Sequence, residues 1–223
     1  LYLEKIEKSI LNEISSDQLI YEYIFTPYVL GLLSYFDKDR KFKILDYGGG
    51  IGRSYVNLNK SLIDNRNLEY FIYDNKENCS LGKKHLSNKK NLFFFSDLNR
   101  LNFDYDLLHF GSVIQYIEDL RSELHSLFEV NKKKQPKHIL ISDAFVGVNE
   151  SFITQADYYG YKHPFKFRSW EDLIGDLELF NYKIKAKGPL VSKINNNFEF
   201  YDMSNLPKGC RIKNTWHILL EAY

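Results

Sequence analysis

Apolar and polar positions alternate in blocks along the middle of the chain. Short apolar runs, which are typical of strands buried on both sides, are separated by amphipathic stretches that are typical of helices. The predicted strands are residues 41–47, 68–74, 92–98, 105–112 and 138–146. One predicted helix follows the turn at 48–52, and two others cover residues 79–88 and 113–130. Strands that alternate with helices form parallel sheets covered on both faces, so the pattern predicts a Rossmann-like, doubly wound α/β domain with a mostly parallel sheet.

Different patterns flank this block. Residues 1–38 carry apolar positions at helical spacing with a break near Thr26 and Pro27, which predicts two or three helices forming a prefix or lid before a domain of residues 39–223. Residues 149–167 are polar and aromatic without a clear period, and we expect an irregular segment there. A helix capped by Ser169 is predicted next. Strands are then expected at 182–193, 198–204 and 215–223.

A glycine-rich turn, KILDYGGGIGRS at 43–54, follows the first predicted strand. Glycine clusters mark places where the backbone comes close to another group, and the carboxyl end of a strand in this fold class is where ligands bind. A phosphate-binding P-loop needs Lys-Ser/Thr after its last glycine, but Arg53 and Ser54 stand here at the wrong distance. The dinucleotide fingerprint G-x-G-x-x-G, started from Gly48, would need glycine at position 53.

The turn does spell D-x-G-x-G-x-G, which resembles motif I of the class I S-adenosylmethionine (SAM)-dependent methyltransferases. The resemblance implies that the turn binds SAM through Asp46, Tyr47, Gly48, Gly49, Gly50 and Gly52. Three later segments fit the same pattern. Asp74 ends the second strand and would accept hydrogen bonds from the ribose hydroxyls; Asp97 and Leu98 would contact adenine; Gly111 and Gln115, in HFGSVIQYIED, would line the pocket around adenine and the sulfonium.

A closer resemblance is carried by LDYGGGIG, HFGSVIQYIED and SFITQ. These segments look like a family of methyltransferases encoded in bacterial capsule and O-antigen polysaccharide clusters, over residues from about 20 to the end. The family implies O-methyl transfer to a sugar hydroxyl, with the sugar linked to a nucleotide or carried on a growing glycan. We expect Gln155, Tyr159 and Tyr161 to bind this sugar.

A sugar hydroxyl is a weak nucleophile and benefits from a general base. His163 is the first candidate, because it lies in the aromatic segment where the acceptor would be positioned. Asp143 ends the fifth strand on the cofactor side of the sheet, and it could be the base or orient His163. A metal site would need a second carboxylate nearby, and no Asp-Asp pair follows, so no metal is predicted.

Composition limits the partners. With 30 basic and 29 acidic residues the net charge is +1, which gives no footprint for nucleic acid or an anionic membrane. Cys79 and Cys210 are too few for a disulfide framework, and no secretory signal or membrane-inserted segment is apparent, so we expect a cytoplasmic protein, either a monomer or a homodimer. Two alternatives stay open: an NAD(P)-dependent oxidoreductase, disfavoured by Arg53, and a non-catalytic binding module that keeps the cofactor fold.

Overall fold

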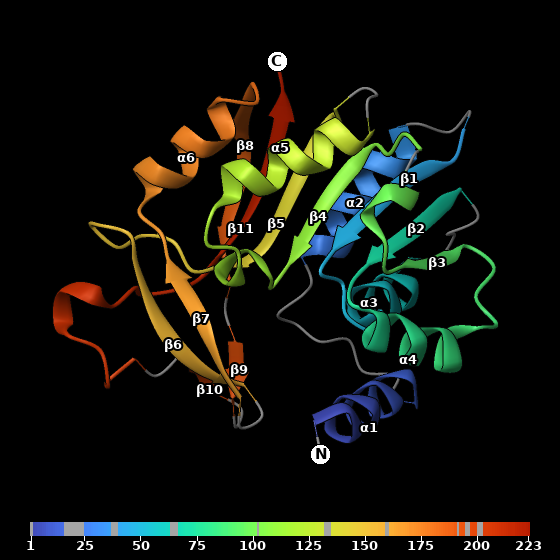
Figure 1. Ribbon diagram of the computed structural model, residues 1–223, viewed down its shortest axis with the longest axis horizontal. Helices are drawn as coiled ribbons and strands as arrows, with labels where there is room; N and C mark the ends of the chain where they lie inside the picture. Colours follow the sequence, from blue (N-terminus) through green and yellow to red (C-terminus); the bar gives the residue numbers. More distant parts are fainter. Residues whose placement is uncertain are drawn as a thin grey trace.

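A central seven-stranded sheet has the order β3-β2-β1-β4-β5-β11-β8 in the structure, which is a computed structural model (Figure 1). Its strands are β1 (Phe42–Tyr47), β2 (Leu68–Tyr73), β3 (Leu92–Phe95), β4 (Leu107–Gly111), β5 (His138–Ala144), β8 (Tyr182–Pro189) and β11 (Trp216–Ala222). The first five strands pair in parallel, and β11 lies antiparallel between β5 and β8. The predicted doubly wound, mostly parallel sheet is confirmed.

The structure describes most of the chain, in ten segments. They are residues 2–15, 25–36, 40–62, 67–101, 103–131, 135–158, 161–190, 192–194, 197–199 and 203–223.

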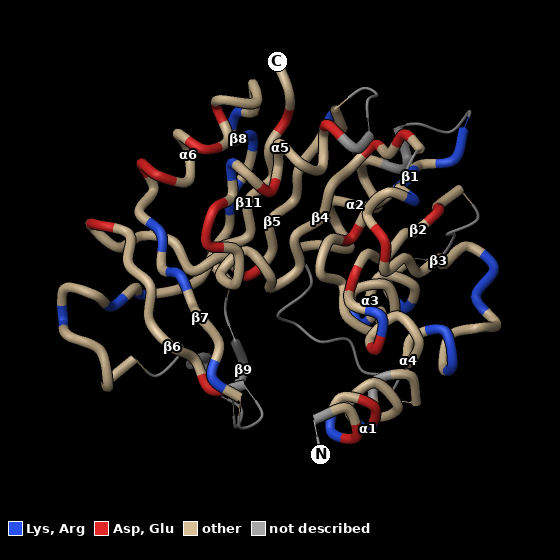
Figure 2. The backbone as a smooth tube through the Cα atoms, viewed as in Figure 1, with Lys and Arg blue, Asp and Glu red and all other residues tan. Residues whose placement is uncertain are grey.

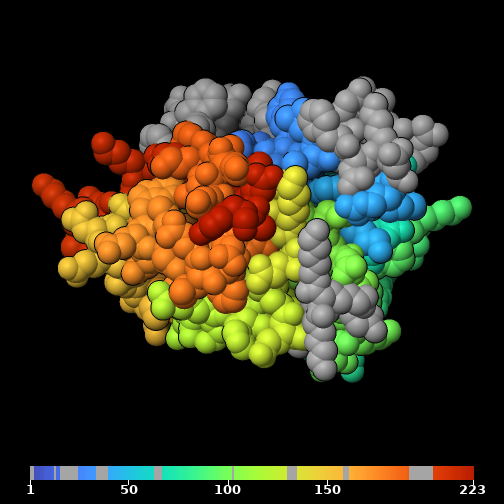
Figure 3. Space-filling view, turned by 90° about the horizontal axis from the view of Figure 1, so that it is seen from above, coloured from blue at the N-terminus to red at the C-terminus, as the bar shows by residue number. Residues whose placement is uncertain are grey.

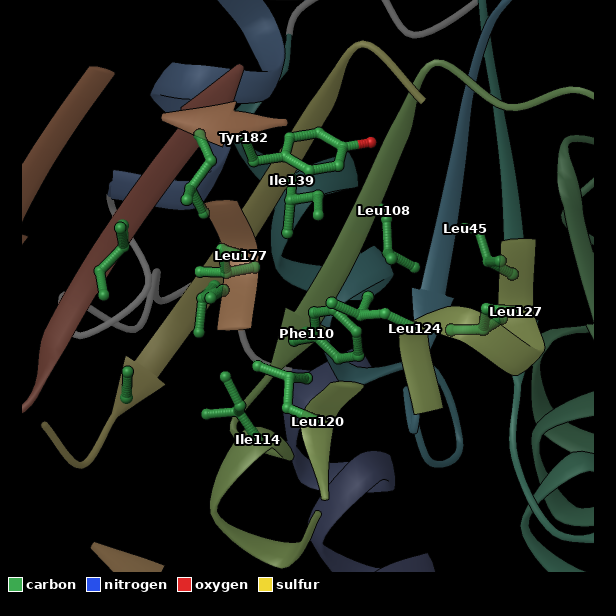
Figure 4. Close-up of a cluster of buried hydrophobic side chains, with 14 of the residues drawn as sticks. Leu45, Leu108, Phe110, Ile114, Leu120, Leu124, Leu127, Ile139, Leu177 and Tyr182 are labelled. Atoms are coloured by element: carbon green, nitrogen blue, oxygen red, sulfur yellow. The ribbon is translucent and has the colours of Figure 1, made fainter. Parts of the chain in front are cut away.

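Helices cover both faces of the sheet. One face carries α2 (Phe25–Phe36), α3 (Arg53–Ser61) and α4 (Lys76–Leu86), with α1 (Tyr2–Ser15) packed against α3 and α4, and the other face carries α5 (Leu120–Asn131) and α6 (Trp170–Glu178). Successive strand residues point to opposite faces. Leu107 therefore packs into the cluster under α1–α4, whereas Leu108 packs into the cluster under α5 and α6 that is shown in Figure 4. This explains why the strands read as unbroken apolar runs.

A helix begins close to the predicted break. Thr26 and Pro27 lie in the first turn of α2, where the missing N–H of proline is tolerated because that group has no partner inside the helix. Glu7 of α1 lies 2.7 Å from Lys84 Nζ and 2.5 Å from His85 Nε2, so α1 is tied to α4. The predicted helical positions Leu19, Ile20, Tyr23 and Ile24 lie outside the described residues.

The segment expected to be irregular forms an antiparallel hairpin of β6 (Phe152–Tyr158) and β7 (Tyr161–Phe167). The prediction of an irregular segment was wrong. The inward face of β6 carries Phe152, Thr154 and Ala156, so a large apolar, a polar and a small residue share one face and the period-2 pattern is hard to recognise in the sequence. Thr154 pairs with Phe165 and Ala156 with His163 on one face, which packs on a small apolar cluster around Phe145 and Met203. Pro164 is compatible with this hairpin because a two-stranded ribbon leaves each strand one edge without ladder bonds.

The predicted helix at 113–130 is divided in two. The 3₁₀ turn η3 (Ile114–Tyr116) comes first, and α5 begins only at Leu120. Asp119 accepts a hydrogen bond from the Ser122 N–H at 3.1 Å, so it caps the new helix. The cap predicted for α6 is confirmed, because Ser169 Oγ accepts from the Asp172 N–H at 3.0 Å.

Short elements complete the fold. They are η2 (Leu98–Arg100), η4 (Lys208–Cys210) and the paired strands β9 (Ser192–Ile194) and β10 (Asn197–Glu199). Seen from above, the C-terminal elements in orange and red adjoin the yellow-green residues of α5 (Figure 3). Acidic and basic residues are interspersed over the described elements (Figure 2). Within those elements, every helix is too short or too polar to cross a bilayer.

Two mid-helix glycines allow the packing beneath α4 to be tested. We expect Gly82→Ala to destabilise the protein by about 1–3 kcal/mol, because its Cβ would lie 2.3 Å from the Phe94 ring and overpacking outweighs the roughly 1 kcal/mol that alanine adds to a helix. Gly175→Ala in α6 is the matched control. Its Cβ meets nothing within 4 Å, so thermal denaturation should show a gain in Tm there and a loss at Gly82. A gain at both positions would contradict the packing described.

Candidate functional site

A pocket of about 970 Å³ lies at the carboxyl ends of the parallel strands. β1 pairs with both β2 and β4, so the strand order reverses there, and this is where open α/β sheets bind ligands. The residues after β1, β2, β4 and β5 line the floor, while α1 and the β6–β7 hairpin contribute opposite walls. In Figure 1 the carboxyl ends of β4 and β5 point toward the space between α1 and this hairpin. The volume suits a ligand of the size of a nucleoside cofactor together with a small acceptor.

The glycine turn forms one side of the floor. Gly48, Gly49 and Gly50 line the pocket, and Gly50 has a φ of +58°, a conformation that side chains with a Cβ rarely adopt. A Cβ at position 50 would meet nothing within 4 Å, which means that it would project into the open pocket. The main chain of this turn is therefore the surface offered to a ligand.

Asp74, directly after β2, holds the turn in place. Its Oδ2 accepts from the Gly50 N–H at 2.8 Å, and its Oδ1 accepts from the Asn75 N–H at 2.7 Å and from Asn78 Nδ2 at 2.8 Å. The carboxylate lines the pocket, as does Asn78, whose buried Oδ1 has no hydrogen-bond partner among the described residues. Asp74 thus brings a carboxylate acceptor to the pocket, and the Asn78 amide holds that carboxylate in place.

Two non-glycine residues with left-handed backbones meet at the ends of β4 and β5. Ser112 has a φ of +54° and Asp143 a φ of +59°. The Ser112 hydroxyl donates to Asp143 Oδ2 at 3.1 Å, and the Ser112 N–H donates to the Ser142 carbonyl at 2.9 Å. Such conformations cost energy and gather at functional sites. Here they direct a carboxylate that is only 7% exposed toward the pocket.

The turn η3 forms the next part of the wall and is held by a buried arginine. Gln115 lines the pocket, and its buried Oε1 has no hydrogen-bond partner in the described parts of the chain. Arg168, directly after β7, donates through Nη1 to the Ile114 carbonyl at 2.8 Å and through Nη2 to the Ile117 carbonyl. Burial lowers the pKa of Arg168 to about 10, so the guanidinium keeps its charge at neutral pH. The hairpin and η3 are thereby fixed to each other.

The far wall is aromatic with polar groups at its rim. The ring of Tyr116 lies edge-on to those of Phe165 and His163, with centroids 5.4 and 6.4 Å away. Phe145 and Phe165 are buried, whereas His163 is exposed and lines the pocket. A ring-shaped acceptor would find both stacking surfaces and hydrogen-bonding groups on this wall.

Nine of the residues singled out by sequence line this pocket. They are Gly48, Gly49, Gly50, Asp74, Gly111, Gln115, Asp143, Gln155 and His163. Strand alternation places Gln155 on the hairpin face opposite to that of His163, so both residues line the pocket but from opposite faces of the hairpin. The site thus combines residues 115 positions apart in sequence, from Gly48 to His163.

Six others are not among the residues that line it. They are Asp46, Tyr47, Gly52, Asp97, Leu98 and Tyr161. Asp46 is buried beneath the turn, and the Tyr47 hydroxyl donates to Glu123. Gly52 allows close packing, since its Cβ would lie 2.9 Å from Leu86, and Asp97 caps η2 by accepting from the Asn99 N–H.

Leu98 is one of these six, and Tyr159 is the sixteenth predicted position. Leu98 packs against the core cluster under α5, so its contact with adenine, like that of Asp97, stays a prediction. Tyr159 lies outside the described residues.

Sequence reasoning missed Ser112, Tyr116 and Phe145. Ser112 and Tyr116 stand inside the segment HFGSVIQYIED, and Phe145 follows Asp143 by two positions. The strand-end position was a usable signal for all three. The left-handed backbone of Ser112 had none, because serine has no special preference for that conformation.

The cysteines are free, and Cys79 is buried. The Cys79 thiol donates to the carbonyl oxygens of Asp74 and Phe95, and burial raises its pKa, which keeps it protonated and unreactive.

Over the described segments, no three His, Cys, Asp or Glu side chains gather in a way that could hold a metal ion.

Comparison with known proteins gives matches in structure alone. No protein-family profile matches the sequence, and no curated protein matches it. The fold is similar to that of magnesium protoporphyrin IX methyltransferase from Synechocystis PCC 6803, solved with bound SAM (TM-score 0.52, 12% identity, 91% of this chain and 80% of that chain). It is also similar to a glycopeptide N-methyltransferase complexed with SAM (TM-score 0.53, 9% identity, 82% and 88%).

A third similar structure is the O-methyltransferase from neocarzinostatin biosynthesis, in complex with S-adenosylhomocysteine (SAH) and 1,4-dihydroxy-2-naphthoic acid (TM-score 0.52, 14% identity). The match covers 81% of this chain but spans about half, 49%, of that longer protein. All three are named as methyltransferases, and each was solved with SAM or SAH. The chain has the fold of the SAM-dependent methyltransferases.

Proposed function

We propose that the protein is a SAM-dependent O-methyltransferase that acts on a sugar hydroxyl in bacterial surface polysaccharide biosynthesis. One observation carries the proposal: the glycine turn, Asp74 and Asp143, from three different strand ends, converge on one pocket at the switch point of the sheet. The acceptor would be a nucleotide-linked or glycan-linked sugar, which agrees with a cytoplasmic monomer or homodimer. The sugar and the pathway rest on the sequence resemblance described above.

The cofactor half of the pocket fits SAM. The open side of Gly50 leaves room for a ligand against the main chain, and the Asp74 carboxylate, which already accepts three hydrogen bonds, keeps a free lone pair on Oδ2 for a ribose hydroxyl. Asn78 Oδ1 and Gln115 Oε1 are buried acceptors without partners in the described structure, and amino groups of the cofactor would satisfy them. When bound, SAM supplies a methyl group already activated by its positively charged sulfur.

The acceptor half contains groups suited to a sugar hydroxyl. Methyl transfer needs the acceptor oxygen aligned with the methyl carbon, and rings on Tyr116 and Phe165 offer a stacking surface that fixes a sugar ring. His163 would take the hydroxyl proton, while Asp143, fixed by Ser112, would accept a hydrogen bond from the acceptor. Gln155, Tyr159 and Tyr161 would bind the remaining hydroxyls from the hairpin.

Calorimetric titration with SAH and with NAD tests the cofactor. We expect SAH to bind and NAD not to bind, and we expect Asp74→Ala to weaken SAH at least about tenfold. Each hydrogen bond to a charged acceptor contributes roughly 1.5–3 kcal/mol, and tenfold corresponds to about 1.4 kcal/mol. Asp106→Ala is the comparison variant, since Asp106 directly precedes β4, accepts hydrogen bonds from Arg40 and does not line the pocket. Its affinity should stay within about twofold of wild type.

Three results would redirect the proposal. Tight NAD binding would favour the oxidoreductase, and an unchanged affinity of Asp74→Ala would remove Asp74 from the ribose site. SAH binding without turnover on a panel of nucleotide-linked hexoses, glycans and small phenols would favour a non-catalytic module. Methylation of phenols alone would keep the activity and reject the sugar.

A further inference from the structure

A row of buried polar side chains crosses the sheet directly beneath the pocket. Its five members, which we call the polar row, come from β2, β1, β4, β5 and α2 in that spatial order and are at most 3% exposed. They are Tyr70, Asp46, His109, Ser142 and Thr26. Burying polar groups in a sheet interior costs free energy of folding unless they are paired, so a continuous row of them indicates a specific role.

The contacts make His109 the centre of the row. The Tyr70 hydroxyl donates to Asp46 Oδ2 at 2.8 Å, and His109 Nδ1 lies 3.0 Å from Asp46 Oδ1. On the other side, His109 Nε2 is 3.0 Å from Ser142 Oγ, which is 2.8 Å from Thr26 Oγ1. Asp46 and Tyr70, the latter 3.4 Å away, are the titratable groups in contact with His109 in the described structure.

The row supports the pocket at three points. A Cβ on Gly49 would lie 2.6 Å from Asp46 Oδ2, which places the carboxylate directly against the glycine turn. A Cβ on Gly111 would lie 2.9 Å from His109 Cε1, and Ser142 directly precedes Asp143. The positions of the glycine turn, the end of β4 and the end of β5 therefore depend on the contacts within the polar row.

We propose that His109 is a positioning residue that holds the glycine turn and Asp143 in fixed relation through Asp46 and Ser142. The Ser142 hydroxyl lies at hydrogen-bond distance from Nε2, 3.0 Å away, while Nδ1 lies 3.0 Å from Asp46 Oδ1 without the alignment of a hydrogen bond, so His109 contacts both neighbours from one ring. The Ser142 oxygen remains available to accept from Thr26. The role rests on the proposed function, because it concerns the turn's ability to receive SAM.

Replacement of His109 should change cofactor affinity without removing any group that lines the pocket. We expect His109→Leu to raise the Kd for SAH at least about tenfold, measured by calorimetry, because the buried Asp46 carboxylate loses its neighbour and the turn shifts. His109→Asn, whose amide nitrogen can reach the place of Nδ1, should restore the affinity to within about threefold of wild type. A residue that only fills space would give the opposite order, since leucine is the larger apolar replacement.

A double-mutant cycle separates positioning from loss of stability. If His109 acts through Asp46, adding His109→Leu to Asp46→Asn should change the SAH Kd by less than about twofold, whereas independent effects would multiply. Tyr182→Phe is the matched control, because it removes a buried hydrogen bond, 2.5 Å to the Pro136 carbonyl, outside this pocket. It should lower Tm and leave the SAH Kd unchanged.

The outcomes are distinguishable. Wild-type protein that fails to bind SAH overturns the proposed function, and the role of His109 with it. Wild-type binding with an unchanged Kd for His109→Leu, or multiplicative effects in the cycle, overturns the role of His109 alone. Should His109→Leu not fold, Ser142→Ala removes the Nε2 partner with a smaller change and is expected to raise the Kd at least about threefold; an unchanged Kd there would likewise reject the proposal.

Discussion

Gly50→Val is expected to abolish cofactor binding, with the Kd for SAH raised at least about 100-fold. The valine side chain would occupy the open space on the pocket side of Gly50, where a Cβ meets no protein atom within 4 Å. Because the φ of +58° also disfavours a β-branched residue, part of the effect would come from strain in the turn. Calorimetry with SAH measures the loss, and circular dichroism should show that the fold is largely preserved.

Two further variants separate obstruction from strain. Gly50→Ala carries a similar backbone cost with a smaller side chain, so its Kd should fall between those of wild type and Gly50→Val. Gly147→Ala places strain at a φ of +123° away from the pocket lining, and it should lower Tm without altering SAH binding. If Gly50→Val unfolds, or if Gly50→Val and Gly147→Ala lose SAH affinity equally, the glycine turn serves packing and not cofactor binding.

His163→Ala is expected to lower kcat by about 10²–10⁴-fold, with SAH affinity unchanged, because the imidazole would accept the proton of the acceptor hydroxyl. The measurement uses the acceptor identified in the turnover screen. The dependence of kcat on pH is compared between wild type and variant, and the two profiles should differ because the variant lacks the base.

Asp143→Asn is the companion to this variant. Asparagine has nearly the shape of aspartate and tolerates a left-handed backbone, so the replacement removes the charge with little cost at a φ of +59°. We expect a smaller loss of kcat than in His163→Ala. A His163→Ala variant that keeps more than about one third of kcat, with the wild-type pH profile, would assign the proton to Asp143 instead.

The sheet could be predicted from sequence because each parallel strand is buried on both faces and reads as an apolar run. Strand β5, from His138 to Ala144, is buried throughout, and the apolar run predicted its place. The hairpin could not be predicted in the same way. Its apolar face consists of residues such as Phe152 and Ala156 and contacts only a small cluster, so local alternation is weak and tertiary contacts decide the structure.

The candidate site was predicted where it depends on the main chain and on strand ends. Gly50 and Asp74 could be located because a glycine turn after one strand and an acid after the next have fixed places in this fold class. The burial of Asp46 and the capping role of Asp97 could not, since a carboxylate beside a pocket and one beneath it look alike in sequence. Which face a strand-end residue takes depends on backbone angles that the sequence does not reveal.

The position of β11 has a consequence for how the protein is synthesised. β8 contacts the sheet through β11, which lies between β8 and β5. During translation, residues 182–189 leave the ribosome before the strand that will connect them to β5 exists. Because the chain is made from its N-terminus onward, β5 keeps a free edge until Trp216–Ala222 have been synthesised. The nascent chain is thus most exposed to aggregation over the interval between residues 144 and 222, and a stop before β11 would leave β8 without a strand partner and β5 with one free edge.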